Sequence, residues 1–377
     1  MDAPAGATAQ VARRFPGIRP TLFQFPSTSR TAVARAFGET LAVATAGGGA
    51  LGLTGFPAGW LSGAILAVAA AAIAGRPMLL PVLFTRAVFV LIGISLGSVV
   101  TPETLHGMAT YPLSIAALIV AMACIGLAGA AYLRFIHGWD KVAACLAAAP
   151  GGMSQVLVLA ADLGVDLRAV AIVQSIRVVI VAVGLPAGLS LFGLVGHAVR
   201  RGNGPLTFAL ADEMALLVVA ASICGMIAHR FKLPGGLLFG AMFASALLHG
   251  IGFVHAVVPS WTANAAMISL GAITGSRFTS TPLRLLLKYL GAGCGSFAVA
   301  VTIATIFASG LIAYFSLSPA EVMMAFAPGS VDAMMLLALA LHLDPVYVGA
   351  HHVTRIVLVS VAMSVIARRA AGKKAPN

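Results

Sequence analysis

Charged residues are scarce in this chain of 377 residues, and the acidic ones are the scarcest. Charged side chains make up 9% of the sequence, against about 25% in soluble domains, whereas 60% of the residues are hydrophobic and the mean hydropathy is +1.02. Stretches such as 113–133 carry no charge over the length of about 20 residues that a helix needs to cross a bilayer. The composition excludes an ordinary soluble domain and predicts an all-α, polytopic membrane protein.

Cysteine is rare as well, and its placement excludes two further classes. The cysteines lie singly within apolar runs, with neither a CxxC pair nor a Cys/His ligand spacing: Cys124, Cys145, Cys224 and Cys294. A disulfide framework or a zinc site would require such spacings, so we expect no metal and no cofactor. The sequence also lacks a Walker motif, so any transport would draw its energy from an ion gradient rather than from a nucleotide.

The basic residues outnumber the acidic ones, 23 to 11, and give a net charge of +12. They flank the apolar segments and lie in both tails, which is typical of orientation signals under the positive-inside rule and not of a nucleic-acid interface. In residues 1–36 the charges stand too far from an apolar core for a secretory signal. We predict basic cytoplasmic tails at 1–36, which we expect to be disordered, and at 370–377, and no nucleic-acid partner.

A motif that occurs twice is the most informative feature of the chain. Residues 149–181 read APGGMSQVLVLAADLGVDLRAVAIVQSIRVVIV, and residues 327–359, 178 positions later, read APGSVDAMMLLALALHLDPVYVGAHHVTRIVLV. The two copies share a helix-breaking Pro-Gly pair, an aspartate and an arginine: Pro150 and Pro328, Gly151 and Gly329, Asp166 and Asp344, Arg177 and Arg355. A duplicated helix break followed by a duplicated arginine is typical of transporters built from internal repeats.

The duplication covers most of the chain, as a first membrane repeat at 37–200 and a second at 201–369. FPAGWLSGA at 56–64 corresponds to LPGGLLFGA at 233–241, and IGISLGS at 92–98 corresponds to LGAITGS at 270–276. Each repeat is predicted to hold about five spanning helices, which fall at about 39–55, 57–75, 84–101, 113–133 and 166–195, and at about 207–229, 234–252, 262–279, 285–315 and 344–367.

The two Pro-Gly segments, at about 141–163 and 319–342, decide the topology. If each segment crosses the membrane, the repeats are parallel; if each enters and returns, a repeat has five crossings and the two are inverted. With five crossings and the amino terminus inside, the inner loops collect most of the basic residues: Arg76, Arg86, Arg134, Lys141, Arg168, Arg230, Lys232, Arg277, Arg284 and Lys288. The positive-inside rule favours this inverted arrangement, with broken or re-entrant helices and cytoplasmic termini.

The paired motif resembles that of the membrane AbrB family. APGGMSQ and APGSVDA are each followed by D-x10-R, and the resemblance covers roughly residues 40–370. Members of this family carry the labels ammonia monooxygenase and regulator. At the level of fold the family is similar to inverted-repeat transporters, among them cation/proton antiporters, bile-acid symporters and glutamate/sodium symporters. The second copy departs in having Ser330 where the first has Gly152, which reduces the backbone freedom expected there.

Both helix breaks are candidate binding sites. A helix interrupted in the bilayer exposes N–H groups at the start of the following half-helix, with about half a positive charge. Two such starts near the midplane would bind a carboxylate or a similar anion, whereas the alternative is a kink needed only for packing. On the first interpretation the substrate-binding residues are Pro150, Gly151, Gly152, Ser154, Pro328, Gly329, Ser330 and Asp332.

Arg177 and Arg355 complete the predicted substrate site. Each lies 11 residues after its aspartate, which places the two charges about three helical turns, roughly 16 Å, apart. Asp166 and Asp344 then lie at helix starts, where an N-cap is their expected structural role. A charge inside the membrane must face protein, water or an anion. The arginines therefore either bind an anionic substrate or cap carbonyl groups that the helix break leaves free.

Asp332 has Ser154 as its counterpart in the first copy. It either binds a proton or a sodium ion and so supplies coupling, or it caps the second half-helix as serine can.

His351 and His352 stand one turn before Arg355, where the first copy has Val173 and Gln174. Adjacent helical residues point about 100° apart, so the two histidines do not suit one metal ion. One of them, or Gln174, can face a cavity as a secondary contact.

We therefore predict a secondary transporter for a small anionic or zwitterionic solute, bound near the bilayer midplane between the two repeats and coupled to sodium ions or protons. The alternative is a membrane-embedded regulator, acting directly through a partner or indirectly by exporting a metabolite. A monooxygenase would need clustered metal ligands, which the scattered histidines do not suggest, so we expect no enzyme. The expected location is the inner membrane, and faces of small residues are compatible with a homodimer.

Overall fold

The computed structural model describes residues 30–99, 111–195, 211–231, 233, 235–256, 259–315 and 317–372. Within these ranges the regular elements are all helical, as predicted. The first half of the chain forms α2 (Arg30–Gly52), α3 (Gly59–Ile73), α4 (Val82–Gly97), α6 (Tyr111–His137), α7 (Lys141–Ala148), α8 (Met153–Asp162) and α9 (Leu167–Leu191). The second half forms α10 (Ala211–Arg230), α11 (Gly236–Gly250), α12 (Ser260–Gly275), η3 (Ser276–Phe278), α13 (Leu283–Phe315), α14 (Pro319–Phe326), α15 (Val331–Ala340) and α16 (Pro345–Gly372).

Five of the described helices are long and apolar enough to cross a membrane: 111–137, 167–191, 212–230, 283–315 and 345–366. They belong to α6, α9, α10, α13 and α16, which fits the expected multi-pass membrane protein. Four of the other predicted spans, α3, α4, α11 and α12, are shorter helices of 15 or 16 residues. The predicted tails need a correction at their inner ends. Helix α2 begins at Arg30 and α16 ends at Gly372, so parts of both predicted tails are helical. Phe37 stacks edge-on against Phe84 of α4, which gives the start of α2 a packing partner. Residues 1–29 and 373–377 lie outside the described residues.

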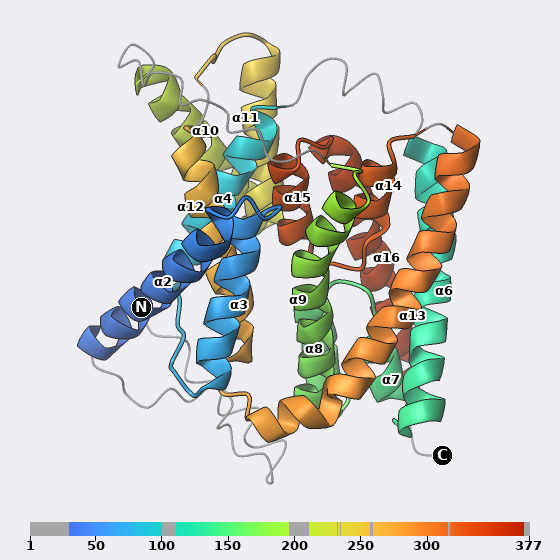
Figure 1. Ribbon diagram of the computed structural model, residues 1–377. Coiled ribbons are helices and arrows are strands. Elements are labelled where there is room, and N and C mark those ends of the chain that lie inside the picture. Colours follow the sequence, from blue (N-terminus) through green and yellow to red (C-terminus); the bar gives the residue numbers. More distant parts are fainter. Residues whose placement is uncertain are drawn as a thin grey trace.

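The two halves of the chain have matching elements in the same order. Helices α2, α3, α4 and α6 correspond to α10, α11, α12 and α13, the short pair α7 and α8 corresponds to α14 and α15, and α9 corresponds to α16. Figure 1 shows that these elements sort into two groups, each with contributions from both halves. The first helix group contains α2–α4 and α10–α12, and the second helix group contains α6–α9 and α13–α16.

Glycines on α4 and α12 join the two halves within the first helix group. A Cβ atom at Gly93 of α4 would lie 2.4 Å from the carbonyl oxygen of Leu238 in α11, and one at Gly271 of α12 would lie 2.9 Å from that of Leu61 in α3. Leu61 and Leu238 occupy corresponding places in the two repeats. Each half therefore supplies a glycine face against which the other half packs a helix, at a distance that leaves no room for a side chain.

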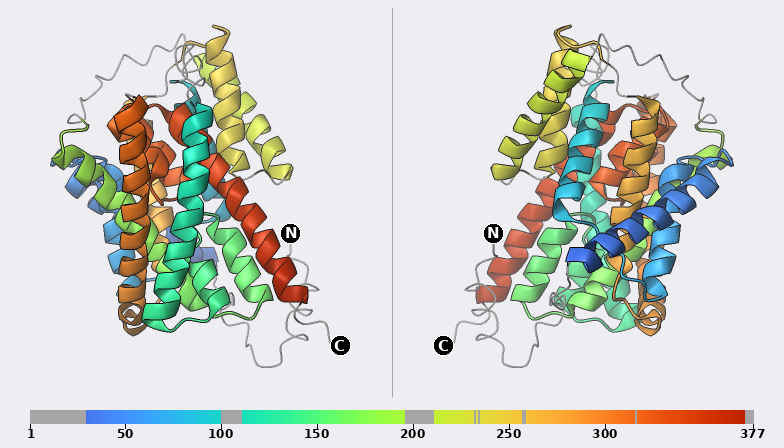
Figure 2. Two further views of the ribbon diagram at one scale, coloured as in Figure 1. Left: turned by 90° about the vertical axis from the view of Figure 1, so that its right-hand side faces the viewer. Right: turned by 90° about the vertical axis from the view of Figure 1, so that its left-hand side faces the viewer.

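Both predicted helix breaks are present, and each separates two short helices. Helices α7 and α14 have 8 residues each, and α8 and α15 have 10 each, which corresponds to about 12 and 15 Å. Neither helix alone reaches across a hydrocarbon core of about 30 Å. In the views of Figures 1 and 2, α7 and α8 lie toward the end of the molecule where α13 begins, and α14 and α15 lie toward the end where α13 finishes.

Candidate functional site

The first break takes its shape from glycine. Gly151 has φ 113° and Gly152 has φ 65°, values that side-chain-bearing residues rarely adopt, and Gly152 is the N-cap of α8. The second break is built differently, because the N-cap of α15, Ser330, is extended with φ −78° and ψ 144°. Serine adopts this conformation without strain, so the departure of the second copy from glycine fits a different local backbone.

Arg177 of α9 caps the carbonyl groups that the first break leaves without helical partners. Its guanidinium donates hydrogen bonds to the carbonyl oxygens of Ala148 at 3.4 Å and Ala149 at 2.8 Å. One turn earlier on α9, the amide nitrogen of Gln174 donates to the carbonyl oxygen of Leu146 at 2.9 Å. Three carbonyls at the end of α7 are thus satisfied by two side chains of one neighbouring helix.

Arg355 of α16 does the same for the second break. Its guanidinium donates to the carbonyl oxygens of Ala327 at 2.5 Å and Gly329 at 2.8 Å. His352 takes the place of Gln174, with its Nε2 at 3.2 Å from the carbonyl oxygen of Met324 and its Nδ1 against Arg355. In both halves, therefore, the arginine caps carbonyl groups that the helix break leaves free, which is the second of the two roles considered above. The Nε atoms of both arginines stay buried without a hydrogen-bond partner among the described residues.

Arg355 also brings the two breaks together. Its side chain, only 1% exposed, reaches the first break, where its Nε lies 3.6 Å from the place a Cβ would occupy at Gly151. The next glycine, Gly152, lies against Val359 of α16, whose Cγ1 would be 3.2 Å from a Cβ there. The start of α8 therefore rests on the helix that caps the second break.

Asp166 and Asp344 are N-caps, as predicted, and each has a tyrosine partner that the motif did not reveal. One oxygen of each carboxylate accepts hydrogen bonds from two backbone N–H groups in the first turn of the following helix. The other oxygen accepts a hydrogen bond from the hydroxyl of Tyr289 in the case of Asp166 and of Tyr111 in the case of Asp344. The two tyrosines are also 178 positions apart, which is the signal that could have identified them.

The Asp344 cap yields a stability prediction. We expect Asp344→Ala to lower the free energy of unfolding by about 1 kcal/mol, because two N–H groups of α16 lose their acceptor. Thermal unfolding of the purified protein in detergent measures the change. Asp162→Ala, at an exposed position at the end of α8, is the control and should match the wild type. Equal stability of Asp344→Ala and Asp162→Ala would contradict the capping role.

Asp332 does not act as a side-chain cap. It is the second residue of α15, half-buried, and the structure gives its carboxylate no hydrogen bond or salt bridge to the described residues. The N-cap Ser330 makes no side-chain capping bond either. Ser154, the counterpart of Asp332, lies in the first turn of α8, but its side chain is outside the described part of the chain.

His351 and His352 are both fully buried by protein groups. The two ring nitrogens of His351 lie 2.8 Å from the carbonyl oxygen of Tyr347 and 2.9 Å from the hydroxyl of Ser114. Its imidazole thus ties α16 to α6, whereas His352 serves the second break. In the ranges that the structure describes, no three His, Cys, Asp or Glu side chains lie close enough to hold a metal ion.

Arg277 is a site residue for which the sequence predicts only the role of an orientation charge. It extends from η3, and its Nη1 lies 3.9 Å from the sulfur of Met153, the first residue of α8. Its guanidinium interacts electrostatically with the carboxylate of Asp332. Arg277 follows the repeated LGAITGS segment, and the first copy has Val99 in its place. The signal in the sequence that could have identified Arg277 is that the first repeat has no charge at the matching position.

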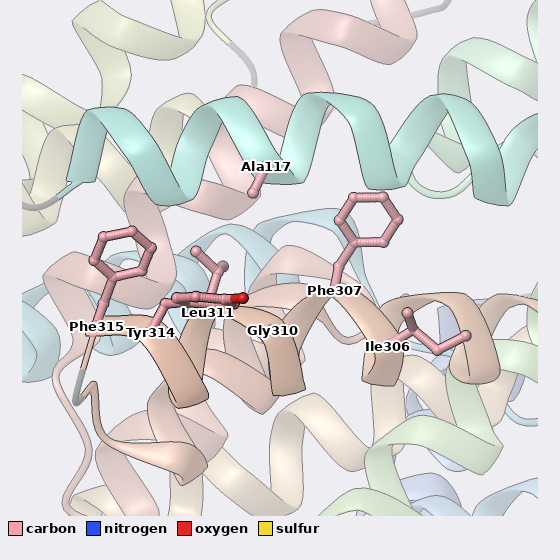
Figure 3. Close-up of a pocket in the computed structure, with 7 residues that line it drawn as sticks. All are labelled: Ala117, Ile306, Phe307, Gly310, Leu311, Tyr314 and Phe315. Atoms are coloured by element: carbon pink, nitrogen blue, oxygen red, sulfur yellow. The ribbon is translucent and has the colours of Figure 1, made fainter.

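Two apolar hollows lie near these elements. A cavity of about 270 Å³ borders the second break and is lined by α9, α13, α14, Ala327 and Pro328. A groove of about 290 Å³ between α6 and α13, shown in Figure 3, is lined by Ala117, Ile306, Phe307, Gly310, Leu311, Tyr314 and Phe315. No residue of either break lines this groove, and its side chains are apolar except for the hydroxyl of Tyr314.

Comparison with known proteins places this arrangement in a family. Residues 60–371, which contain both breaks and all the capping side chains, match the family described as transition state regulatory protein AbrB. The chain is 25% identical over 343 residues to the "Uncharacterized protein YhjN" of Bacillus subtilis (strain 168), covering 85% of this chain and 89% of that protein. It is 24% identical over 315 residues to the "Putative regulator AbrB" of Escherichia coli (strain K12), covering 83% and 90%. The chain therefore belongs to the AbrB family.

Proposed function

We propose that this protein is a secondary transporter that binds a small anionic or zwitterionic solute where its two helix breaks meet. The observation that carries the proposal is the position of Arg355, which caps the second break and lies against Gly151 in the first. Two interrupted helices that meet inside an apolar bundle are the usual setting of a transport site.

The electrostatics of the breaks support an acidic group on the solute. The ends of α7 and α14 are already neutralised by the arginines that cap their carbonyl groups. The starts of α8 and α15 keep free N–H groups and the positive ends of their helix dipoles. Because a buried arginine is costly in a membrane, the two buried arginines beside the breaks also favour a compensating negative charge.

We further propose that the two repeats are inverted, with five crossings each and with hairpins α7–α8 and α14–α15 entering from opposite sides. Their positions at opposite ends of the second helix group in Figures 1 and 2 support this topology. The short lengths of the four helices support re-entry rather than crossing. With the predicted distribution of basic residues, both termini would be cytoplasmic and the protein would lie in the inner membrane.

Movement of one helix group against the other would give access to the site from each side in turn. The contacts between the groups are made mainly by α9 and α15 of the second group, against α3, α4, α12 and η3. Helix α15 begins with the second break, so a shift at this boundary would act directly on the site. Asp332 lies at the same boundary, in the first turn of α15, where its carboxylate can contact a cation or a cationic group of the solute.

The test is uptake by proteoliposomes loaded with the full-length protein. Small carboxylates and amino acids would be offered with an imposed sodium or proton gradient. We expect gradient-dependent uptake of at least one solute, and a loss on the order of tenfold or more in Gly152→Ala, which displaces the start of α8 against Val359. Gly164→Ala is the matched control, because Gly164 also has a positive φ but has open space around it.

Uptake that is equally reduced in both glycine variants would assign the effect to backbone strain instead of to the break. The absence of uptake for every solute, in protein-loaded and in protein-free liposomes alike, would overturn the transporter proposal.

The name of the Escherichia coli relative, which calls that protein a regulator, favours regulation as the second candidate function. Export of a signalling metabolite would make regulation a consequence of transport. A transport-deficient Gly152→Ala protein that still exerts a regulatory effect in cells would instead indicate direct action on a partner.

A further inference from the structure

Two charges at the breaks have no counterpart in the other repeat. The aspartates at the starts of α9 and α16 and the capping arginines occur in pairs, but Arg277 corresponds to Val99 and Asp332 corresponds to Ser154. Both unpaired charges come from the second repeat, on η3 and on α15. A transporter whose two breaks served one purpose would not need this asymmetry, so the two breaks have become chemically different.

Each of the two charges is placed at the start of a different half-helix. Arg277 reaches the first residue of α8, with Nη1 at 3.9 Å from the sulfur of Met153. A thioether is a weak acceptor, and Arg277 makes no other hydrogen bond to the described residues, so nearly all its donor capacity is unused. Asp332 lies in the first turn of α15, and its carboxylate is likewise without a hydrogen bond there.

The two side chains act on each other without closing into a salt bridge. Their charges interact electrostatically, yet no nitrogen of Arg277 lies within the 4.0 Å of a carboxylate oxygen that defines an ion pair. Both residues are half-buried. Two opposite, partly buried charges that do not pair directly remain available to a third group that carries both a positive and a negative charge.

The first break is the positive side of this arrangement. The dipole of α8, the guanidinium of Arg277 at Met153 and the buried, unpartnered Nε of Arg355 beside Gly151 all favour an anion. The second break is less positive, because the carboxylate of Asp332 offsets the positive end of the α15 dipole there, beside the capping guanidinium of Arg355. A solute that carries only a negative charge would leave the carboxylate of Asp332 without a partner of opposite charge.

We propose that the solute is a zwitterion of the amino-acid class, with its carboxylate at the start of α8 beside Arg277 and its ammonium group at Asp332. This inference rests on the proposed transport function and narrows its substrate class. Arg277 and Asp332 are then specificity residues: each recognises one charge of the solute, and the separation of the two breaks selects for a compact molecule. The solute completes the interaction that the two side chains do not make directly.

The experiment measures binding of matched probes to the full-length protein purified in detergent. A panel of L-amino acids is screened by thermal shift, and each hit is then titrated by calorimetry together with its N-acetyl derivative, which is an anion, and its amide, which is a cation. We expect the free amino acid to bind at least about tenfold more tightly than either derivative, because each derivative loses one charge pair.

Single substitutions should remove the two preferences separately. Two variants test the carboxylate: Asp332→Asn, and Asp332→Ser, which copies the first break. Both should bind the amino acid and its N-acetyl derivative with about equal affinity, while some affinity for carboxylates remains. Arg277→Gln should abolish the preference for the amino acid over its amide, and Arg277→Lys should restore part of it. Arg284→Gln, at an exposed position in α13, should bind like the wild type.

Three results would overturn the inference: no amino acid binds, the N-acetyl derivative binds as tightly as the amino acid, or Asp332→Asn keeps the full preference. The proteoliposome assay separates this failure from that of the proposed function. Uptake of simple carboxylates without a preference for zwitterions would preserve transport and reject the zwitterion site. The expected binding preferences without any uptake would preserve the site and reject transport.

Discussion

Arg355→Met is expected to lower the free energy of unfolding by about 3 kcal/mol, because the carbonyl oxygens of Ala327 and Gly329 each lose a charged donor. Removal of the buried guanidinium also relieves its own desolvation cost. That relief is the smaller effect, since two carbonyl groups and the ring of His352 are left without their partner in a water-poor interior. Thermal unfolding in detergent should show a fall of roughly 4 °C in the transition temperature.

The same substitution at the matching position provides an internal check. Arg177→Met should destabilise the protein in the same direction, because Ala148 and Ala149 lose their donor in the first break. Arg168→Met, on the same helix but exposed, should unfold like the wild type. If both buried arginine variants kept wild-type stability and lost only their response to solutes, the arginines would be solute ligands and not caps.

The second large effect is expected at the glycine contact between the halves. In Gly93→Leu the new Cβ would lie 2.4 Å from the carbonyl oxygen of Leu238 and 2.7 Å from the Cβ of Ala241, so α4 and α11 must separate. Overpacking against a backbone group that cannot yield costs about 3 kcal/mol or more. We expect most of the protein to be lost as aggregate, which size-exclusion chromatography of fluorescently tagged protein would measure.

Gly126→Leu is the matched control for this variant. Gly126 is also a helical glycine in an apolar segment, on α6, but no atom lies within 4 Å of a Cβ built there. The control should elute as a single wild-type peak. Gly271→Leu, which tests the equivalent contact of α12 with α3, should fail in the same way as Gly93→Leu. A stable Gly93→Leu protein would show that α4 and α11 are not held at this distance.

The sequence predicted the elements better than their contacts. Proline and glycine in an otherwise apolar segment are sufficient to place both helix breaks, and an aspartate before an apolar run is sufficient to place the N-caps. The predicted start of the first helix was wrong, because α2 begins at Arg30, within the predicted tail. A contact between Phe37 and Phe84 adds packing there that the composition does not reveal.

The partners within the site depend on tertiary structure. Periodicity puts Arg177 and Arg355 near the bilayer centre, but whether they meet a solute or a carbonyl depends on how deeply α7 and α14 enter beside them. The sequence predicts only a loop charge for Arg277, because its neighbour Met153 is 124 residues away in the chain and lies in the other helix group. Such a contact leaves no local pattern in the chain.

The glycine contacts between the halves also constrain the order of events during synthesis. Helix α4 packs mainly on α10, α11, α12 and α15, all of which are made after it. Until α11 enters the membrane, the glycine face that carries Gly93 has only lipid beside it. The amino-terminal half is therefore not an independent folding unit. The packing of α4 can form only after the second half of the chain has been synthesised and inserted. If translation stopped between residues 191 and 211, the amino-terminal fragment would lack its packing partners and would be degraded. If the two halves were expressed together as separate chains, they could assemble.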